Sequence, residues 1–388
     1  MRQTHALVDL AAFAHNLRLL KALIGPQVGL MAVVKADAYG HGLVPVARAA
    51  QAAGADALAV ALAEEGTRLR QAGVHLPILV LAGLNAQSTR EAVGQGLTLT
   101  AHTPAHLASA SQEAVAQGVT AQVHLKLDTG MNRIGVKTAA QLRELLDMFD
   151  SLPGLALTGA FTHFASADEL GSDMTSRQLD RFLDLARLLP PGIVLHASGS
   201  SALISRVDAR LNMVRAGIAL YGYPPILTTL PLVPVLSWLA EITHVKQIQP
   251  GETVSYGATL KADRPLRVAT LAVGYGDGYS RLLSGKAQVL VNGHRCQVLG
   301  RVCMDMIMVD VTGAGQVTPG MQATLIGRQG QEAVTARELA ELAGTISYET
   351  LLSMSARVPR IYLNDPTKDE THAGQGNEKN QNSRQTGC

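Results

Sequence analysis

The sequence predicts an α/β fold in which an N-terminal (β/α)₈ barrel of the TIM type is followed by a mostly antiparallel β-domain. Two observations support this fold class. Between residues 28 and 220, eight short apolar segments alternate with stretches of helical spacing. After Pro224-Pro225, Gly and Pro separate the apolar segments, and helical patterning becomes scarce. We expect a barrel over residues 1–230, a β-domain over residues 231–364 and a polar, disordered tail over residues 365–388.

The eight apolar segments have the length and composition of buried strands. Between them lie Ala-, Leu- and Gln-rich stretches with helical spacing, such as residues 105–117 and 176–189. Alternating strands and helices imply a parallel sheet, and eight units in roughly 200 residues fit a closed barrel. An open, doubly wound sheet is the alternative; it would leave two edge strands, and the even number of units slightly disfavours it. The predicted strands are residues 29–34, 57–62, 77–82, 97–101, 121–128, 155–163, 192–198 and 213–220.

The second part of the chain predicts a β-domain with few helices. Its apolar segments are separated by turn-forming Gly and Pro, as in antiparallel sheets. One helix is expected over residues 335–344. The predicted strands are residues 236–248, 266–275, 287–293, 296–300, 307–312 and 322–327.

Composition limits the possible functions. The 388 residues are 47% hydrophobic, enough for two domains with a sizeable core, and the net charge of +2 comes without a basic cluster, so we expect no nucleic-acid partner. The three cysteines, Cys296, Cys303 and Cys388, show neither a disulfide framework nor zinc spacing, which suggests a reducing cytoplasm and no metal. The first ten residues lack the apolar core of a signal peptide, and no segment reaches the roughly 20 apolar residues that span a bilayer.

Lys35 ends the apolar run of residues 30–34 and is followed by a turn containing Tyr39, Gly40 and Gly42. A buried ammonium group loses hydration and tends to give up its charge. A neutral amine is a nucleophile for carbonyl compounds such as pyridoxal phosphate (PLP). A lysine at a strand end can also extend its amine to solvent, so Lys35 alone does not decide the function.

Further polar residues collect at or near the ends of the predicted barrel strands. Because active sites of such barrels lie at the carboxyl ends of the strands, these residues predict one shared site. They are Lys35, Lys126, Asp128, His163, His196 and Arg215.

Several sequence blocks, in order over residues 1–363, resemble alanine racemase. The resemblance implies a PLP-dependent enzyme that interconverts L- and D-alanine and supplies D-alanine for peptidoglycan. It also implies a head-to-tail homodimer whose active sites are shared between subunits. The blocks are AVVKADAYGHG (32–42), DTGMNRIG (128–135), THFASADE (162–169), HASGSSAL (196–203), VRAGIALYG (214–222), VGYGDGYSR (273–281), GRVCMDMIMVDV (300–311) and RVPRIY (357–362).

The resemblance assigns two acid/base groups to opposite faces of the substrate. Lys35 would hold PLP and move the Cα proton on one face. Racemisation needs a second group on the other face, and the resemblance places it on Tyr275 of the partner subunit. An ordinary interface tyrosine is the alternative reading of Tyr275.

The resemblance also assigns cofactor-binding residues. Arg215 would hydrogen-bond the pyridine nitrogen and, because a guanidinium does not readily lose its proton, keep that nitrogen unprotonated. This would favour racemisation over transamination or decarboxylation, for which a carboxylate is expected instead. His196 would orient Arg215, and His163 would pack against the cofactor ring. The phosphate would be bound by Tyr39, Ser200 and the backbone amides of Gly217 and Ile218.

For the substrate, the resemblance implies that Arg133 holds the carboxylate, helped by the backbone at Met304, with Asp305 nearby. Lys126, seven residues before Arg133, is carbamylated in several relatives. Carbamylation would turn a like-charged neighbour of Arg133 into an anionic partner, and an unmodified lysine paired with Asp128 is the alternative.

The sequence departs from the family pattern at three positions. Ala356 stands where several relatives have a tyrosine that contacts the phosphate, so one such contact is expected to be missing or replaced. Gly199 and Asp37 stand where many relatives have asparagine. Three other functions stay open: racemisation of another small amino acid such as serine, PLP-dependent decarboxylation, and non-catalytic carriage of PLP.

Overall fold

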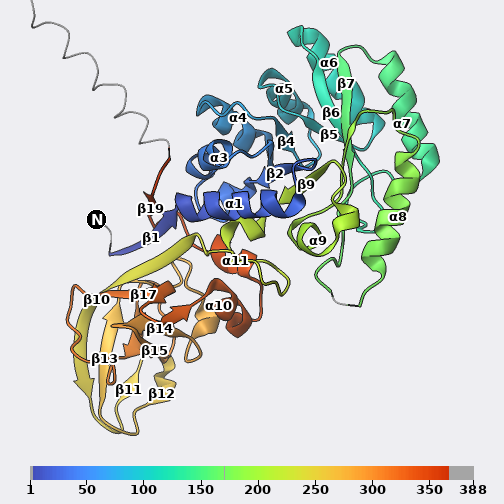
Figure 1. Cartoon of the computed structure of the whole chain (residues 1–388). Coiled ribbons are helices and arrows are strands. Elements are labelled where there is room, and N and C mark those ends of the chain that lie inside the picture. The colour runs from blue at the N-terminus through green and yellow to red at the C-terminus, as the bar shows by residue number, and fades with distance from the viewer. Residues whose placement is uncertain (1–2, 170, 367–388) are drawn as a thin grey trace, which may run out of the picture.

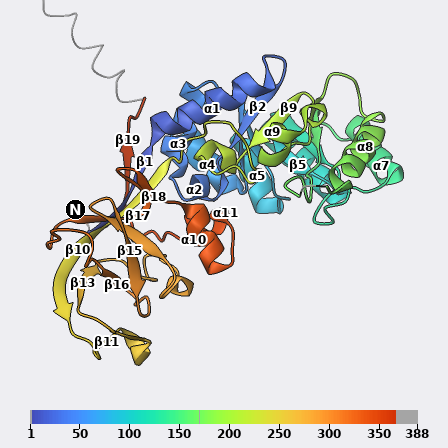
Figure 2. The same cartoon turned by 60° about the horizontal axis from the view of Figure 1, so that its bottom comes forward.

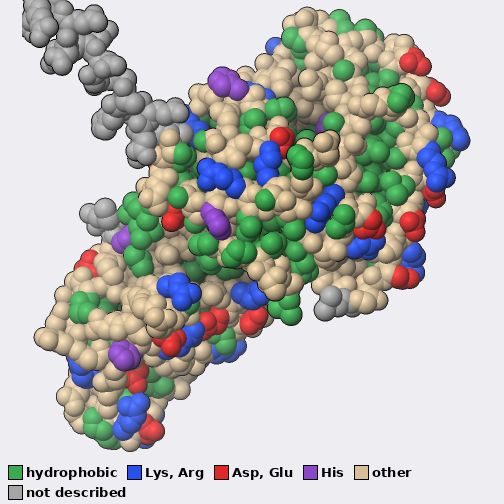
Figure 3. Space-filling view, viewed as in Figure 1, with side chains coloured by type: hydrophobic (Ala, Val, Ile, Leu, Met, Phe, Trp, Pro, Cys, Tyr) green, Lys and Arg blue, Asp and Glu red, His purple; other side chains and the backbone are tan. Residues whose placement is uncertain are grey.

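The computed structural model describes residues 3–169 and 171–366, which form a barrel joined to a β-domain (Figure 1). The predicted fold class is confirmed. Turning the molecule shows that the helices surround the barrel strands and that the β-domain lies to one side (Figure 2). Of the predicted tail, residues 367–388 lie outside the described residues. Positive and negative side chains are mixed over the face seen in Figure 3.

The barrel sheet has eight strands in the described residues, and every pairing between neighbours is parallel. A parallel bridge between Leu79 and Thr98 joins the first and last strands of the sheet order. There the Thr98 N–H donates to the Ile78 carbonyl at 2.8 Å. The barrel is therefore closed, as predicted. The strands are β2 (Gly29–Val33), β3 (Ala57–Val60), β4 (Ile78–Val80), β5 (Leu99–Ala101), β6 (Ala121–Lys126), β7 (Leu155–Phe161), β8 (Val194–His196) and β9 (Met213–Ala216).

Helices connect the barrel strands, and local sequence fixes their ends. Asp9 caps the first helix by accepting from the N–H groups of Ala11 and Ala12, and Thr138 forms a capping box with Gln141. The helices are α1 (Leu10–Ile24), α3 (Leu43–Ala52), α4 (Ala63–Gln71), α5 (Ala86–Gly94), α6 (Pro104–Gln117), α7 (Ala139–Ser151), α8 (Met174–Ala186) and α9 (Ser200–Ser205).

The β-domain is built on a nine-stranded, mostly antiparallel sheet. Its longest strand, β10, pairs with β13 through one half and with β1 and β17 through the other. The strands are β1 (Thr4–Asp9), β10 (Leu236–Ile248), β13 (Leu266–Leu271), β14 (Gln288–Val291), β15 (His294–Leu299), β16 (Ile307–Asp310), β17 (Gln322–Gln329), β18 (Glu332–Val334) and β19 (Arg360–Leu363); β11 (Thr253–Val254) and β12 (Leu260–Lys261) form a separate hairpin. Two helices complete the domain, α10 (Ala336–Ala343) and α11 (Ser347–Leu352).

Strand β1 lies in the sheet of the β-domain although it begins the chain. It pairs antiparallel with β10 and parallel with β19, so Ala6 lies between Trp238 and Arg360. These residues fall within the predicted barrel segment 1–230, and the sequence pattern did not predict a strand there. The domain boundary near residue 230 stays a prediction.

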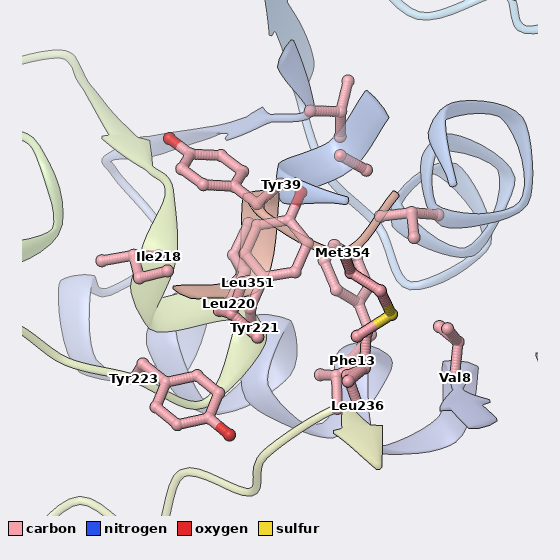
Figure 4. Packing of buried hydrophobic residues seen from close by; sticks show 14 of the residues in the cluster. Val8, Phe13, Tyr39, Ile218, Leu220, Tyr221, Tyr223, Leu236, Leu351 and Met354 are labelled. Atoms are coloured by element: carbon pink, nitrogen blue, oxygen red, sulfur yellow. The ribbon is translucent and has the colours of Figure 1, made fainter. Parts of the chain in front are cut away.

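The junction between the two domains is a shared hydrophobic core. Tyr221 and Phe13 of the barrel unit are fully buried, and Leu351 and Met354 of the C-terminal segment pack in the same cluster (Figure 4). Tyr39 belongs to this cluster, with its ring centroid 4.9 Å from that of Tyr221. Helix α11 is thereby held against the turn that follows Lys35.

Two predicted strands end four residues earlier than expected, at Ala216 and Leu271, and a glycine lies shortly beyond each end. The segment 213–220 is a strand only to Ala216; Gly217 follows, and residues 218–221 form a 3₁₀ turn. The segment 266–275 ends as a strand at Leu271, before the turn that contains Gly274. Within the described ranges, no helix is both long and apolar enough to cross a bilayer.

Candidate active site

A cavity of about 180 Å³ lies at the carboxyl ends of the barrel strands. Most of the sequence-predicted site residues of the barrel meet here, and His196 lies directly behind them. The lining comprises Val33, Lys35, Tyr39, Leu81, Lys126, Arg133, Ile134, Phe161, His163, Gly199, Ser200, Arg215, Gly217, Ile218 and Tyr348.

Lys35 is half-buried at the end of β2. Burial lowers the pKa of its amine, and the positive charges of Arg133 and Arg215 lower it further, whereas Glu65 opposes the shift. A lowered pKa makes the neutral, nucleophilic form of the amine more accessible. The side chain thus has the environment that covalent binding of a carbonyl compound requires.

The turn after Lys35 (α2, Lys35–Tyr39) is left-handed. Four consecutive residues other than glycine, Ala36 to Tyr39, have φ between 52° and 54°. Each costs roughly 1–2 kcal/mol relative to the right-handed conformation, so the surroundings must hold the turn. The Glu65 carboxylate does so by accepting from the N–H of Ala36 at 2.6 Å and that of Ala61 at 2.8 Å.

The opposite end of the cavity is a small polar cradle. Ser200 begins α9, and its hydroxyl accepts from the N–H of Gly217 at 3.0 Å and of Ala219 at 3.3 Å. A Cβ atom at Gly217 would lie 2.7 Å from the Tyr39 hydroxyl, so a larger residue there would displace that hydroxyl. Two hydroxyls beside closely packed backbone form a site suited to a phosphate group.

Arg215 lies buried between two histidines. One terminal nitrogen lies 2.8 Å from His196 Nδ1, and the other lies 3.2 Å from His163 Nδ1. Both nitrogens also donate to backbone carbonyls, including that of Thr162 at 2.8 Å. Burial and repulsion from Arg133 lower the pKa of Arg215 to about 9, so the guanidinium still carries its charge at neutral pH.

Lys126 is almost fully buried on β6, 3% exposed. Its amine donates to the Leu127 carbonyl at 2.9 Å and lies 5.4 Å from the centre of the Phe161 ring. Burial, then the charge of Arg215, lowers the pKa of Lys126 to about 7 against the weaker opposing effect of Asp128. A substantial fraction of this amine is therefore neutral at neutral pH.

The three predicted residues of the β-domain lie apart from this cavity. Tyr275 and Met304 are 43% and 52% exposed, and the Tyr275 N–H donates to the Cys303 carbonyl at 3.0 Å. Asp305 forms an ion pair with Arg357 at 2.6 Å. None of the three is among the described residues that line the cavity within one chain. They lie close together in the β-domain, where Tyr275 and Gly276 donate their N–H groups to the Cys303 and Met304 carbonyls.

Sequence reasoning missed Tyr256, which the structure singles out. Tyr256 is 69% exposed, and the preceding Ser255 has φ 68° and ψ −178°, which residues other than glycine rarely adopt. The Ser255 hydroxyl donates to the Arg301 carbonyl at 2.6 Å and lies 3.5 Å from Cys303 Sγ. The Tyr256 turn and the Tyr275 loop thus attach to the same segment. Nothing in the hydrophobic pattern distinguishes this turn from others.

Sequence reasoning also missed Tyr348 of α11. Tyr348 lines the cavity, and its ring centroid lies 5.8 Å from that of Tyr39. Burial raises the pKa of Tyr348 to about 12, with a smaller contribution from Asp168, so its hydroxyl keeps its proton. Ala356, where a lost phosphate contact was expected, is not among the described lining residues. Tyr39 and Tyr348 thus bring two hydroxyls to the lining of the cavity.

A second cavity of about 530 Å³ adjoins the first. The two share His163, Gly199, Ser200 and Tyr348, and the larger one reaches the C-terminal helices through Arg337 and neighbouring residues. The two cavities therefore share a wall, which lies between the barrel and the segment of α10 and α11.

Comparison with known proteins agrees with this arrangement. Residues 8–225 match the model "Alanine racemase, N-terminal domain" and residues 235–362 match "Alanine racemase, C-terminal domain". The alanine racemase of Symbiobacterium thermophilum is 44% identical over 93% of this chain and 97% of its own length; that of Geobacillus stearothermophilus is 42% identical over 93% and 94%.

Solved structures give the same result for the fold. Alanine racemase from Streptomyces coelicolor superposes with a TM-score of 0.89 at 37% identity, covering 93% of this chain and 98% of the other. Alanine racemase from Bacillus anthracis with bound L-Ala-P superposes with a TM-score of 0.86 at 38% identity, covering 94% of this chain and 96% of the other. Through both of its domains, this chain therefore belongs to the alanine racemase family of isomerases.

Proposed function

We propose that this chain interconverts L- and D-alanine with PLP held on Lys35, and that each active site is shared by two subunits. The observation that carries this is the cavity itself. It places an amine of lowered pKa, a polar cradle and a buried guanidinium around one space. When bound, PLP withdraws electrons from the substrate and makes its Cα proton acidic.

The residues present fit this cofactor. Because Gly217 has no side chain, the hydroxyls of Tyr39 and Ser200 lie close to the backbone there and can contact the same ligand group. Ser200, Tyr39 and the amides at Gly217 and Ile218 would hold the phosphate, and Tyr348 would add a hydroxyl in place of the contact expected at Ala356. Arg215 would meet the ring nitrogen, with His163 beside the ring and His196 behind Arg215.

The two faces of the substrate are proposed to differ in their acid/base group. Lys35 Nζ takes or returns the Cα proton on one face. A tyrosine hydroxyl of the partner's β-domain does so on the other. Tyr275 is the residue that the sequence predicts. Tyr256 is a second candidate, and its strained turn and greater exposure favour it over Tyr275.

Substrate binding is proposed to use Arg133, with the Met304 backbone and Asp305 supplied by the partner. Arg133 lines the cavity and is exposed in the single chain, so its guanidinium is free to meet a carboxylate. The exposed apolar side chains of Tyr256, Tyr275 and Met304 support a second copy of the chain as the group that covers the cavity.

Lys126 is proposed to become carbamylated. A neutral amine attacks dissolved CO₂, a new N–C bond forms and the displaced proton leaves to solvent. The product is an anion that would attract Arg133, where the lysine cation repels it. Incubation with ¹³C-labelled bicarbonate should give a protein-bound carbamate signal that is absent from a Lys126→Ala variant.

The decisive experiment is incubation of the PLP-loaded protein with L-alanine in D₂O. We expect D-alanine with deuterium at Cα. Release of CO₂ would instead indicate a decarboxylase. Exchange with L-serine but not with L-alanine would indicate a racemase for another amino acid, and no exchange with either would indicate a PLP carrier. The proposal also includes the supply of D-alanine to peptidoglycan in the cytoplasm.

A further inference from the structure

We propose that His124 is a positioning residue of this active site, which fixes the tautomer of His196 and thereby the orientation of Arg215. His124 lies on β6, two residues before Lys126, and is not among the described residues that line the cavity. Its importance for the reaction rests on the proposed function, but its effect on the tautomer of His196 does not.

The argument starts from the donors of Arg215. A guanidinium has only N–H donors. The 2.8 Å contact between Arg215 and His196 Nδ1 therefore requires Nδ1 to accept. A neutral His196 must then carry its proton on Nε2. In this buried position the Nε2–H of that tautomer needs an acceptor of its own, because an unpaired buried N–H group is costly.

The second bond follows from the first. His196 Nε2 lies 2.9 Å from His124 Nδ1. Because Nε2 carries the proton, it donates and His124 Nδ1 accepts. His124 in turn carries its proton on Nε2. Three side chains thus form one directed chain of hydrogen bonds from Arg215 through His196 to His124.

Both rings are buried enough to stay neutral. His196 is fully buried and His124 is 8% exposed. Burial, followed by the charge of Arg215, lowers the pKa of His124 to about 4 and that of His196 well below its ordinary value. A protonated His124 would present a second donor to His196 Nε2–H and break the chain.

The sheet is shaped to hold this pair of rings. Gly159 of β7 lies opposite His124, where the strand register shifts, and a Cβ at Gly159 would lie 2.6 Å from the His124 ring. On its other side, His196 stacks on Phe161 with centroids 4.8 Å apart and planes 5° from parallel. The rings have little freedom to take other orientations, and the missing side chain at position 159 provides their space.

Three variants test the chain of hydrogen bonds. His124→Leu removes the acceptor for His196, and Gly159→Ala displaces the His124 ring without changing its chemistry. We expect kcat to fall roughly tenfold to a hundredfold in both variants. Losses of this size are typical when a hydrogen-bond partner that orients a site residue is removed. His124→Asn should restore most of the rate, because the amide oxygen on Cγ can replace Nδ1 as acceptor. His5→Leu, which removes a histidine in β1 of the β-domain, is the control and should leave kcat unchanged.

The direct measurement is ¹⁵N NMR of histidine-labelled protein without cofactor, with the His196 signals assigned from a His196→Gln variant. We expect the Nε2–H tautomer of His196 in the wild type and in His124→Asn, and a mixture of tautomers in His124→Leu. An unchanged His196 tautomer in His124→Leu, or the same rate loss in Asn and Leu variants, would overturn the proposal. If even the wild type fails to racemise alanine, the proposed function fails, while the tautomer measurement still decides the role of His124.

Discussion

At the scale of single residues, the barrel side of the site could be predicted because a few side chains have chemistry that a folded core does not otherwise need. Lys35, Lys126 and Arg215 are cations in apolar strands, and the structure places all three around one cavity. Tyr348 and Tyr256 could not be predicted in this way, because a tyrosine fits a core, a turn or an interface equally well.

Lys35→Ala should remove the covalent attachment of the cofactor. We expect the long-wavelength absorbance of the PLP-loaded protein to disappear and the rate to fall by at least about 10³-fold, since both attachment and proton transfer are lost. Absorbance spectra of the wild type and the variant with equal added PLP measure this. An unchanged spectrum would mean that the cofactor is attached elsewhere.

The tyrosine on the second face can be identified by the direction of the reaction. Replacing the acid/base tyrosine with Phe should keep the cofactor absorbance but slow removal of the Cα proton from L-alanine much more than from D-alanine, by about 10²–10⁴-fold. Tyr256→Phe and Tyr275→Phe serve as matched controls for each other, with exchange in D₂O as the measurement. Equal losses from both enantiomers in both variants would contradict a two-base mechanism.

Lys126 should make stability depend on pH. Its pKa is about 7 in the folded protein and 10.5 as the ordinary value. Below pH 7, Lys126 is protonated in both the folded and the unfolded chain. Between pH 7 and pH 10.5 it is protonated only in the unfolded chain, so the folded state gains stability as the pH rises through this range. From pH 7 to pH 9 in CO₂-free buffer, the wild type should gain about 2–3 kcal/mol relative to Lys126→Met. Urea unfolding measures this, and a flat difference would show that Lys126 is charged in the folded state.

At the scale of elements, the hydrophobic pattern predicts where strands lie but not where they stop. Segments 213–220 and 266–275 continue as apolar sequence past the strand ends at Ala216 and Leu271. The pattern could not show this because the residues that leave the sheet, such as Ile218 and Val273, stay buried. The segments that follow these two strand ends carry part of the polar cradle and Tyr275.

The left-handed turn after Lys35 should depend on Glu65. Glu65→Gln removes the charge and places an amide where the carboxylate accepts from the Ala36 and Ala61 N–H groups. We expect a loss of about 1–3 kcal/mol in the free energy of unfolding. Since the carboxylate raises the pKa of Lys35, that pKa should also fall. Urea unfolding and titration of cofactor attachment against pH measure the two effects. Glu64→Gln, on the first turn of the same helix, is the control. If the two variants unfold and titrate alike, the Glu65 carboxylate is not needed to stabilise the turn.

At the scale of the whole molecule, the division into a barrel and a β-domain could be predicted because the spacing of apolar residues changes after Pro224-Pro225. The assignment of β1 to the second domain could not, since a short alternating strand carries no information about a partner more than 200 residues away. The same is true of α11, whose contact with the Lys35 turn depends on tertiary packing alone.

The proposed sharing of active sites between subunits predicts complementation between inactive chains. A Lys35→Ala chain and a chain lacking the acid/base tyrosine, refolded together in equal amounts, should form hybrid dimers with one intact site of two. If pairing is random, about a quarter of wild-type activity should return. Each inactive chain refolded alone provides the control. No recovery, with hybrids verified by mass, would place both groups in one subunit.

The position of β1 also determines how the chain can be made and divided. β1 is synthesised before the barrel, yet its neighbours on both sides, β10 and β19, are completed only after the barrel. The barrel is therefore translated between β1 and the other eight strands of the same sheet, and β1 stays unpaired while the barrel is made. Cutting the chain near residue 230 would leave an incomplete sheet in the second half, unless residues 4–9 were grafted onto it.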